Sequence, residues 1–167
     1  MKPAVRRGLL VVHIAASVGW IGAIAASLAL AVVAFVTTDP AVAGAVYRVL
    51  EPLAWAALVP FSFAALVTGV IQSLVSPWGL IRHYWVLFKL VLNVFAVAVL
   101  LLYMQTLAGF ARAAAGGGAA VPSLSPVVHA AAAIVLLLIA LVLSVFKPRG
   151  LTTWGYRRQV EPARRSR

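Results

Sequence analysis

The stretch that decides the fold is residues 8–38, which read GLLVVHIAASVGWIGAIAASLALAVVAFVTT and contain no charged side chain. A helix needs about 20 mostly apolar residues to cross the hydrocarbon core of a bilayer. Inside that core every backbone N–H and C=O group must be bonded within the segment, so a helix satisfies such a run. Three more uncharged stretches follow, at residues 52–81, 90–111 and 113–146. The sequence therefore predicts four membrane-spanning helices.

The composition of the chain excludes a soluble fold. Of its 167 residues, 64% are apolar and 10% are charged, against about 45–50% and about 25% in globular proteins. We therefore predict an all-α integral membrane four-helix bundle, a multi-pass protein surrounded by the lipid bilayer. The four-span domain would occupy residues 1–146, with residues 147–167 as a basic cytoplasmic tail. The spans are expected at about residues 9–36, 52–75, 84–107 and 126–146.

Basic residues concentrate in alternate loops. All but two of the 14 Lys and Arg residues lie before the first span, around the start of the third or after the fourth. Cytoplasmic loops carry an excess of Lys and Arg, so both termini are predicted to face the cytoplasm, with the chain in a bacterial-type inner membrane. The basic tail is expected to rest on anionic lipid headgroups. No aromatic-interleaved basic motif accompanies the net charge of +11, so nucleic acid is not an expected partner.

The first connection carries a helix start signal. Asp39 and Pro40 combine an N-cap residue with proline at the first helical position, so residues 40–50 are expected to form a short interfacial helix. The second span would then begin at Pro52. Pro60 lies inside that span and should kink it, because proline removes one backbone hydrogen bond.

Several enzyme classes are excluded by the residues that are missing. Asp39, Glu51 and Glu161 are the only acidic residues, and all three lie in connections or in the tail. No carboxylate pair is therefore available inside the bundle for acid–base hydrolysis. The chain has no Cys, which removes thiolate nucleophiles, thiolate metal ligands and disulfides.

Ionisable residues inside the spans are the candidates for function, because such groups are costly in a bilayer unless paired, hydrated or near a helix end. His13 and Lys89 lie near the starts of the first and third spans. Both of those helices begin at the cytoplasmic side, so the two side chains are predicted at similar depth. His83 lies just below them, whereas His129 begins the fourth span at the opposite face.

Residues spaced three or four apart lie on one face of a helix, so His13 and Lys89 each belong to a stripe of side chains along one face of its span. We expect the two stripes to face each other across the bundle. One interpretation is plain bundle interior, with Lys89 reaching the headgroups and His13 bonded to Ser17 or a carbonyl. The other is a pocket in which His13 ligates a metal or haem iron, opposite Lys89, Asn93 or His83. The stripes are His13, Ser17, Trp20, Ile24 and Ser27 on the first span and Lys89, Asn93, Ala96, Leu100 and Tyr103 on the third.

Two short motifs resemble those of known small membrane proteins. The first is HIAASVGWIG at residues 13–22, and the second is YWVLFKLVLN at residues 84–93. They are similar to motifs of the uncharacterised DUF2269 group and, more distantly, of the CopD copper-resistance proteins and the HemJ-type protoporphyrinogen oxidases. The resemblance implies a haem pocket, or as second choice a copper site, that includes His13 and Lys89.

The candidate site residues follow from the resemblance and the stripes together. Candidates for cofactor binding are His13, Trp20, His83, Lys89 and Asn93, and candidates for metal ligation are His13 and His83. This site would lie between the first and third spans near the cytoplasmic side.

His129 is open to two interpretations. At the first turn of an apolar helix it is expected to act as a capping or interfacial residue. With Tyr103 it could also form a second ligand site at the outer face.

Three classes of function remain open from sequence. The first is a haem- or metal-binding redox protein, the second is a non-catalytic accessory or structural subunit, and the third is a small carrier. The corresponding partners are a membrane redox partner, a larger complex or a second copy of the chain in a homo-oligomer.

Overall fold

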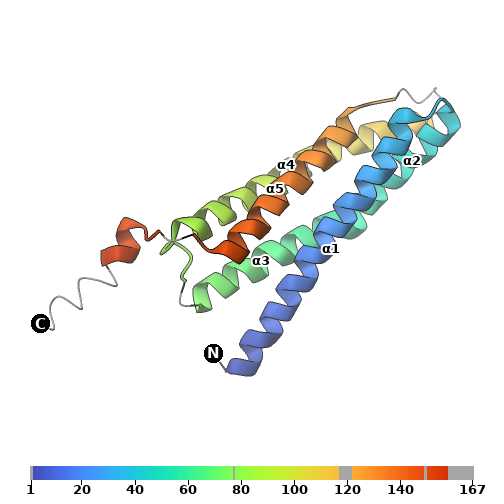
Figure 1. Ribbon diagram of the computed structural model, residues 1–167. Helices are drawn as coiled ribbons and strands as arrows, with labels where there is room; N and C mark the ends of the chain where they lie inside the picture. Colours follow the sequence, from blue (N-terminus) through green and yellow to red (C-terminus); the bar gives the residue numbers. More distant parts are fainter. Residues whose placement is uncertain (1, 77, 117–121, 149, 158–167) are drawn as a thin grey trace, which may run out of the picture.

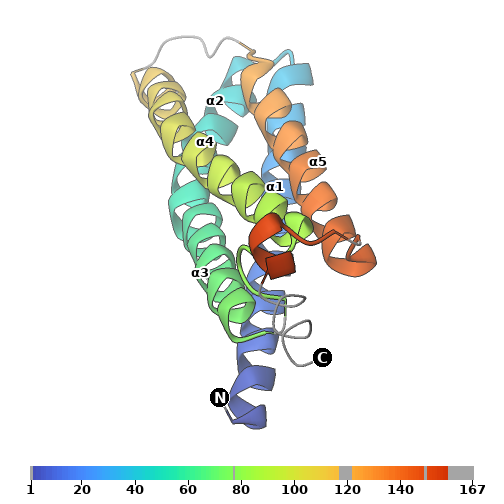
Figure 2. The same ribbon diagram turned by 90° about the vertical axis from the view of Figure 1, so that its left-hand side faces the viewer.

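The computed structural model describes residues 2–76, 78–116, 122–148 and 150–157, and these residues form helices without any β-strand. The α2, η1 and α3 helices follow one another without a break, so the chain makes four long helical runs. Figures 1 and 2 show these runs lying side by side, with the start of α1 and the end of α5 at the same end of the molecule. The helices are α1 (Pro3–Val36), α2 (Pro40–Leu53), η1 (Ala54–Leu58), α3 (Val59–Val75), α4 (Tyr84–Ala115) and α5 (Ser125–Phe146).

All four runs are long and apolar enough to cross a membrane, with mean hydropathies of 1.9 to 2.8. Each predicted span lies inside one of them. This confirms the prediction of an all-helical chain with four helices long and apolar enough to span a membrane. The outside of the molecule is also apolar, since side chains such as Leu102 and Phe146 are 73% and 75% exposed. Exposed apolar surface on this scale is typical of a lipid-facing protein.

The start of α2 agrees with the prediction, but its end does not. Asp39 accepts a hydrogen bond from the backbone N–H of Ala41 at 2.8 Å, and Pro40 occupies the first helical position. The helix does not stop before Pro52, which lies inside α2, and it runs on through η1 into α3. The prediction of a separate interfacial helix at residues 40–50 is therefore wrong.

Packing explains why α2 belongs to the bundle. Its buried face includes Tyr47 and Leu50, which are 2% and 3% exposed, and the helix packs against α4 and α1. Tyr47 stacks on Phe110 of α4 with ring centroids 5.0 Å apart. Close packing of this face against two neighbouring helices holds α2 in line with α3.

A π-helical turn lies directly before Pro60. In η1 the backbone N–H of Val59 bonds to the carbonyl of Ala54, five residues back. Proline lacks an N–H and crowds the carbonyl four residues before it, so a wider turn accommodates its ring. The disruption predicted at Pro60 is present and takes the form of this π turn.

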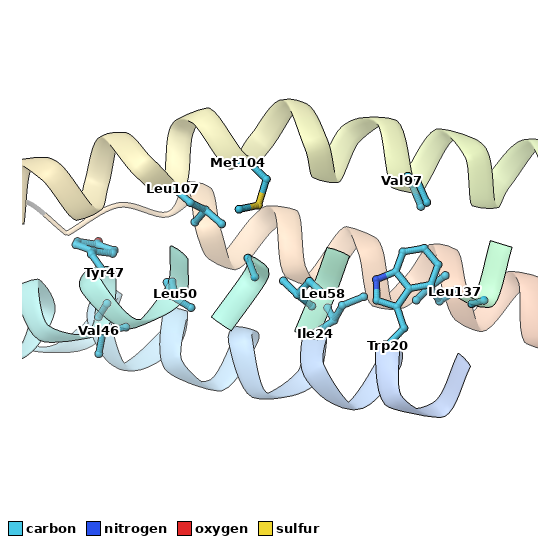
Figure 3. Close-up of a cluster of buried hydrophobic side chains, with 14 of the residues drawn as sticks. Trp20, Ile24, Val46, Tyr47, Leu50, Leu58, Val97, Met104, Leu107 and Leu137 are labelled. Atoms are coloured by element: carbon cyan, nitrogen blue, oxygen red, sulfur yellow. The ribbon is translucent and has the colours of Figure 1, made fainter. Parts of the chain in front are cut away.

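The core is apolar and is shared by all four runs. Figure 3 shows Trp20 and Ile24 of α1 packed with Leu58, Met104 and Leu137 from the other runs. Both α1 and α4 pack against the α2–η1–α3 run and against α5, so α1 and α4 lie diagonally opposite each other. Cavities between the helices are therefore lined from both of these diagonal helices.

Residues 150–157 fold back onto the connection between α3 and α4. The backbone N–H of Thr152 donates to the carbonyl of Arg82 at 3.0 Å, and that of Tyr84 donates to Gly150 at 3.3 Å. The Thr152 hydroxyl donates to the carbonyl of Ile81 at 2.7 Å. This docked segment is the first part of the predicted basic tail, and residues 158–167 of that tail lie outside the described residues.

Candidate functional site

A cavity of about 780 Å³ lies between α1, α3, α4 and α5, at the end of the molecule that holds the start of α1 and the end of α5. We call it the cationic cavity because Arg6, Arg7, Lys89 and Lys147 line it and, among the described residues, no Asp or Glu does. Ligand pockets typically hold about 300–1,000 Å³, so the cavity is large enough for a cofactor. Its charge favours an anionic ligand.

His13 is half-buried on α1, and its Nδ1 atom lies 3.0 Å from the Thr68 hydroxyl oxygen on α3. The single hydrogen of that hydroxyl goes to the carbonyl of Ala64, one turn back, at 2.5 Å. The Thr68 oxygen therefore accepts a hydrogen bond from Nδ1–H of His13. The proton sits on Nδ1, which leaves the lone pair on Nε2. Metal-binding histidines have this form, with one nitrogen donating to a protein group and the other free to bind.

Gly69 gives the imidazole its space. A Cβ atom at Gly69 would lie 3.0 Å from Cε1 and 3.6 Å from Nδ1 of His13. Gln72, one turn further along α3, donates through Nε2 to the carbonyl of Leu9 at 3.0 Å. α3 therefore sets both the position and the orientation of the His13 ring.

Lys89 enters the cavity from α4. Its ammonium group donates to the Ser144 hydroxyl of α5 at 2.8 Å, and that hydroxyl donates to the carbonyl of Ala140 at 2.8 Å. Lys89 thus bonds within the bundle. An ammonium group has three hydrogens, so this bond leaves donors for a ligand. Asn93 lies one turn on, where its Nδ2 donates to the Lys89 carbonyl at 2.8 Å, and it also lines the cavity.

The structure places His83 at the start of α4. His83 is the N-cap residue of α4, and its Nδ1 donates to the carbonyl of Trp78 at 2.6 Å. Its ring packs edge-on against the Trp78 ring, with centroids 5.1 Å apart. In the described part of the chain, the residues that line the cationic cavity do not include His83. The same part holds no group of three or more His, Cys, Asp or Glu side chains arranged for a metal ion.

A second cavity of about 150 Å³ lies further along the bundle, toward α2, and we call it the small pocket. Trp20 is the one described residue that lines both cavities. All ten residues of the two predicted stripes line one cavity or the other. The stripes therefore both face the interior, as predicted, but they are divided between two sites.

The small pocket contains the two residues of the predicted outer site. The rings of Tyr103 and His129 are stacked, with centroids 3.9 Å apart and planes inclined by 17°. The Tyr103 hydroxyl lies 2.9 Å from the Ser125 hydroxyl, and Nδ1 of His129 lies 2.9 Å from the Ser125 carbonyl. The structure thus brings Tyr103 and His129 together at the far end of the bundle from His13.

Four positioning residues were not among the residues predicted to form the site of His13 and Lys89. Thr68, Gly69 and Gln72 lie in the second span and Ser144 in the fourth, and all are polar or small residues in otherwise apolar segments. The spacing of Thr68 and Gln72, four residues apart on one helix face, was a usable signal. The signal for Ser144 was weaker, because a lone serine in a membrane helix often bonds only to its own backbone.

Comparison with models of protein families, with curated proteins and with solved structures finds no match for this chain. The fold and the two cavities define a class, a four-run helical protein of the multi-pass membrane type with one cationic and one apolar internal site.

Proposed function

We propose that this chain is a haem-binding redox protein of the membrane, with haem held in the cationic cavity. The observation that carries the proposal is the state of His13, whose Nδ1 is bonded to Thr68 so that Nε2 presents its lone pair. The motif resemblance supports the same ligand, since the matching residues of the HemJ-type oxidases are thought to lie at a haem site.

The residues of the cationic cavity fit a haem. Haem iron is commonly held by a histidine nitrogen, and His13 supplies one. The two carboxylates of haem are anions, and Arg6 and Arg7 line the part of the cavity nearest the start of α1. Arginine binds carboxylates through paired hydrogen bonds. Trp20 provides an aromatic wall for a flat apolar ring system.

A lone copper ion fits the cavity less well. Copper sites in proteins use several nitrogen or sulfur ligands from the chain, and His13 is the one imidazole among the described residues that line the cavity. A porphyrin supplies four nitrogen ligands itself, so it needs one or two from the protein. Lys89 and Asn93 offer the facing polar groups.

The contacts indicate what the protein would contribute to such a site and what the haem would contribute. Bound haem would supply one-electron chemistry, which is a property of the cofactor. Thr68 holds the His13 ring in the ligating tautomer, and Gly69 leaves room for it. The apolar side chains in the lining would limit the water beside the bound group and thereby tune the site.

We also propose that the cationic cavity faces the cytoplasm of a bacterial-type inner membrane. The start of α1, the end of α5 and most of the described Lys and Arg residues lie at this end, whereas Arg48 and Arg112 lie toward the other. Positive residues are retained on the cytoplasmic side.

Absorption spectroscopy of the His13→Ala variant tests the haem proposal. The wild-type protein, purified in detergent after expression with haem available, should show a Soret band that shifts on reduction with dithionite. The band should be lost in His13→Ala and recovered when imidazole is added to fill the vacated position. Thr68→Val should retain haem with about 10–100-fold lower affinity, because second-shell partners of metal ligands typically contribute this much.

His83→Ala is the matched control, because it removes an imidazole that lies outside the cavity. Its spectrum should equal that of the wild type. A colourless, monodisperse wild-type protein would contradict the haem proposal, and so would a Soret band that survives in His13→Ala.

A further inference from the structure

The small pocket differs from the cationic cavity in the polarity of its lining. It lies between α4 and α5, with α1, α2 and η1 behind it, and Figure 2 shows α4 and α5 diverging toward this end of the molecule. Among the described residues its lining carries no Lys, Arg, Asp or Glu and is almost entirely apolar. A dry apolar cavity of about 150 Å³ accepts a molecule the size of benzene. The pocket, also about 150 Å³, therefore suits one uncharged ring.

Two polar groups at the pocket have spare hydrogen-bonding capacity. A carbonyl can only accept, so the bond between His129 and the Ser125 carbonyl uses the Nδ1–H of His129 and leaves a lone pair on Nε2. The hydroxyls of Tyr103 and Ser125 have two hydrogens between them and share one bond. Tyr103 lines the pocket and Ser125 does not, so the hydrogen available to a ligand is that of the Tyr103 hydroxyl, with Ser125 donating to Tyr103. The pocket thus combines an apolar interior with one acceptor and one donor.

We propose that the small pocket binds the ring of a quinone or of its reduced quinol, with the apolar tail lying in the bilayer between α4 and α5. A quinone carbonyl would accept the spare hydrogen of the Tyr103–Ser125 pair. A quinol hydroxyl would donate to Nε2 of His129. Neither form of the ligand is charged, which suits this pocket and distinguishes it from the cationic cavity.

An acyl chain of a lipid is the competing occupant, and the polar groups favour the quinone over it. An acyl chain makes no hydrogen bonds, so it would leave Nε2 of His129 and the spare hydroxyl hydrogen unused. The inference goes beyond the proposed haem site and does not depend on it, because the hydrogen-bonding residues Tyr103 and His129 do not line the cationic cavity. Trp20 is the one described side chain common to the two linings.

Fluorescence quenching can test the proposal in protein prepared without haem. Trp20 is the one tryptophan of the described residues that lines the small pocket, and quinones quench indole fluorescence on close approach. A benzoquinone that carries one isoprenoid unit should quench the protein saturably in detergent. Trp20→Phe should remove the saturable part and leave only the linear part, which arises from quinone dissolved in the micelle.

Two variants locate the ligand. Ala133→Phe places a ring in the pocket and should weaken quinone binding at least tenfold, whereas Val135→Phe, on the exposed side of the same helix, should not change it. His129→Phe keeps a ring against Tyr103 but removes the acceptor. It should weaken binding of the reduced quinol about five- to tenfold, which is the effect of one hydrogen bond, and leave quinone binding nearly unchanged.

Three results would overturn the proposal. They are quenching that does not saturate, equal binding by Ala133→Phe and wild type, and equal quinol binding by His129→Phe and wild type. Size-exclusion profiles confirm that each variant is folded, and the His129→Phe result stands if Ala133→Phe proves unstable. If the haem proposal fails because no Soret band is seen, the quinone test is unaffected, since the quenching assay uses protein without haem.

Discussion

At the residue scale, two ionisable side chains of the cationic cavity each bond to a hydroxyl from a neighbouring helix. Thr68 of α3 meets His13 of α1, and Ser144 of α5 meets Lys89 of α4. Hydrogen bonds between membrane helices average only about 0.6 kcal/mol. Such bonds contribute little to overall stability. Their main effect is to fix the tautomer of His13 and the direction of Lys89.

The close approach of Gly69 to the His13 ring predicts a difference between two glycine substitutions. Gly22→Ala adds a Cβ with nothing within 4 Å, so it should stabilise α1 by up to about 1 kcal/mol through helix propensity. Gly69→Ala gains the same propensity but places a Cβ 3.0 Å from the His13 ring, which must shift. We therefore expect Gly69→Ala to melt at a lower temperature than Gly22→Ala and to bind haem more weakly.

Thermal unfolding in detergent, followed by circular dichroism, measures the first difference, and haem titration measures the second. If both variants melted at the same temperature and bound haem equally, α3 would not set the position of the His13 ring.

At the element scale, two segments are shaped by contacts that their own sequences do not reveal. α2 passes through Pro52 and continues because its buried face packs against α4 and α1. Residues 150–157 dock onto the connection between α3 and α4 through backbone bonds that involve Thr152 and Gly150. Gly155 packs directly against the backbone of Arg82 in this contact.

The docked segment predicts contrasting effects of two further glycine substitutions. A Cβ at Gly155 would overlap the Arg82 carbonyl oxygen and lie 2.9 Å from its Cγ, so Gly155→Ala should displace the segment. Gly150→Ala meets only the Tyr84 ring, at an ordinary 3.7 Å, and should be tolerated. Hydrogen exchange should therefore speed up at the Thr152 amide in Gly155→Ala, with little change in Gly150→Ala.

Exchange by mass spectrometry, with peptides covering residues 150–157, makes this comparison. Equal protection in the two variants would show that the backbone bonds survive without the close Gly155 contact.

At the scale of the whole molecule, the four apolar runs bring the start of α1, the end of α5 and most of the described positive charge to one end. The cationic cavity is at that end and the small pocket is nearer the other. If the molecule spans a membrane, the two sites therefore sample different depths, with only the Trp20 side chain common to both linings.

Labelling of single cysteines tests the orientation, and the chain suits it because it has no native Cys. Lys2→Cys and Tyr156→Cys lie at the end with the start of α1 and the end of α5, and Thr38→Cys lies at the connection between α1 and α2. In intact spheroplasts a membrane-impermeant maleimide should label only Thr38→Cys. All three should react once the membrane is permeabilised. The reverse pattern would place the cationic cavity on the outer side.

Much of the fold could be predicted from the sequence, and the candidate site only in part. The stripes that contain His13 and Lys89 were correctly placed inside the bundle, because periodicity along one helix is a local property. The partners Thr68 and Ser144 were not identified. His83, a candidate facing partner of His13, is not among the described residues that line the cationic cavity. Which residues of different helices meet depends on the rotation and register of those helices.

The sequence by itself determined the number of long helices, their approximate ends and the faces that turn inward. These properties follow from apolar length, charge and helical period, all of which act within one segment. Only the tertiary structure decided that α2 and α3 form one run, that Thr68 orients His13, and that the polar stripes serve two cavities. The physical reason is that side-chain packing between helices distant in the chain sets their contacts, and no single segment contains that information.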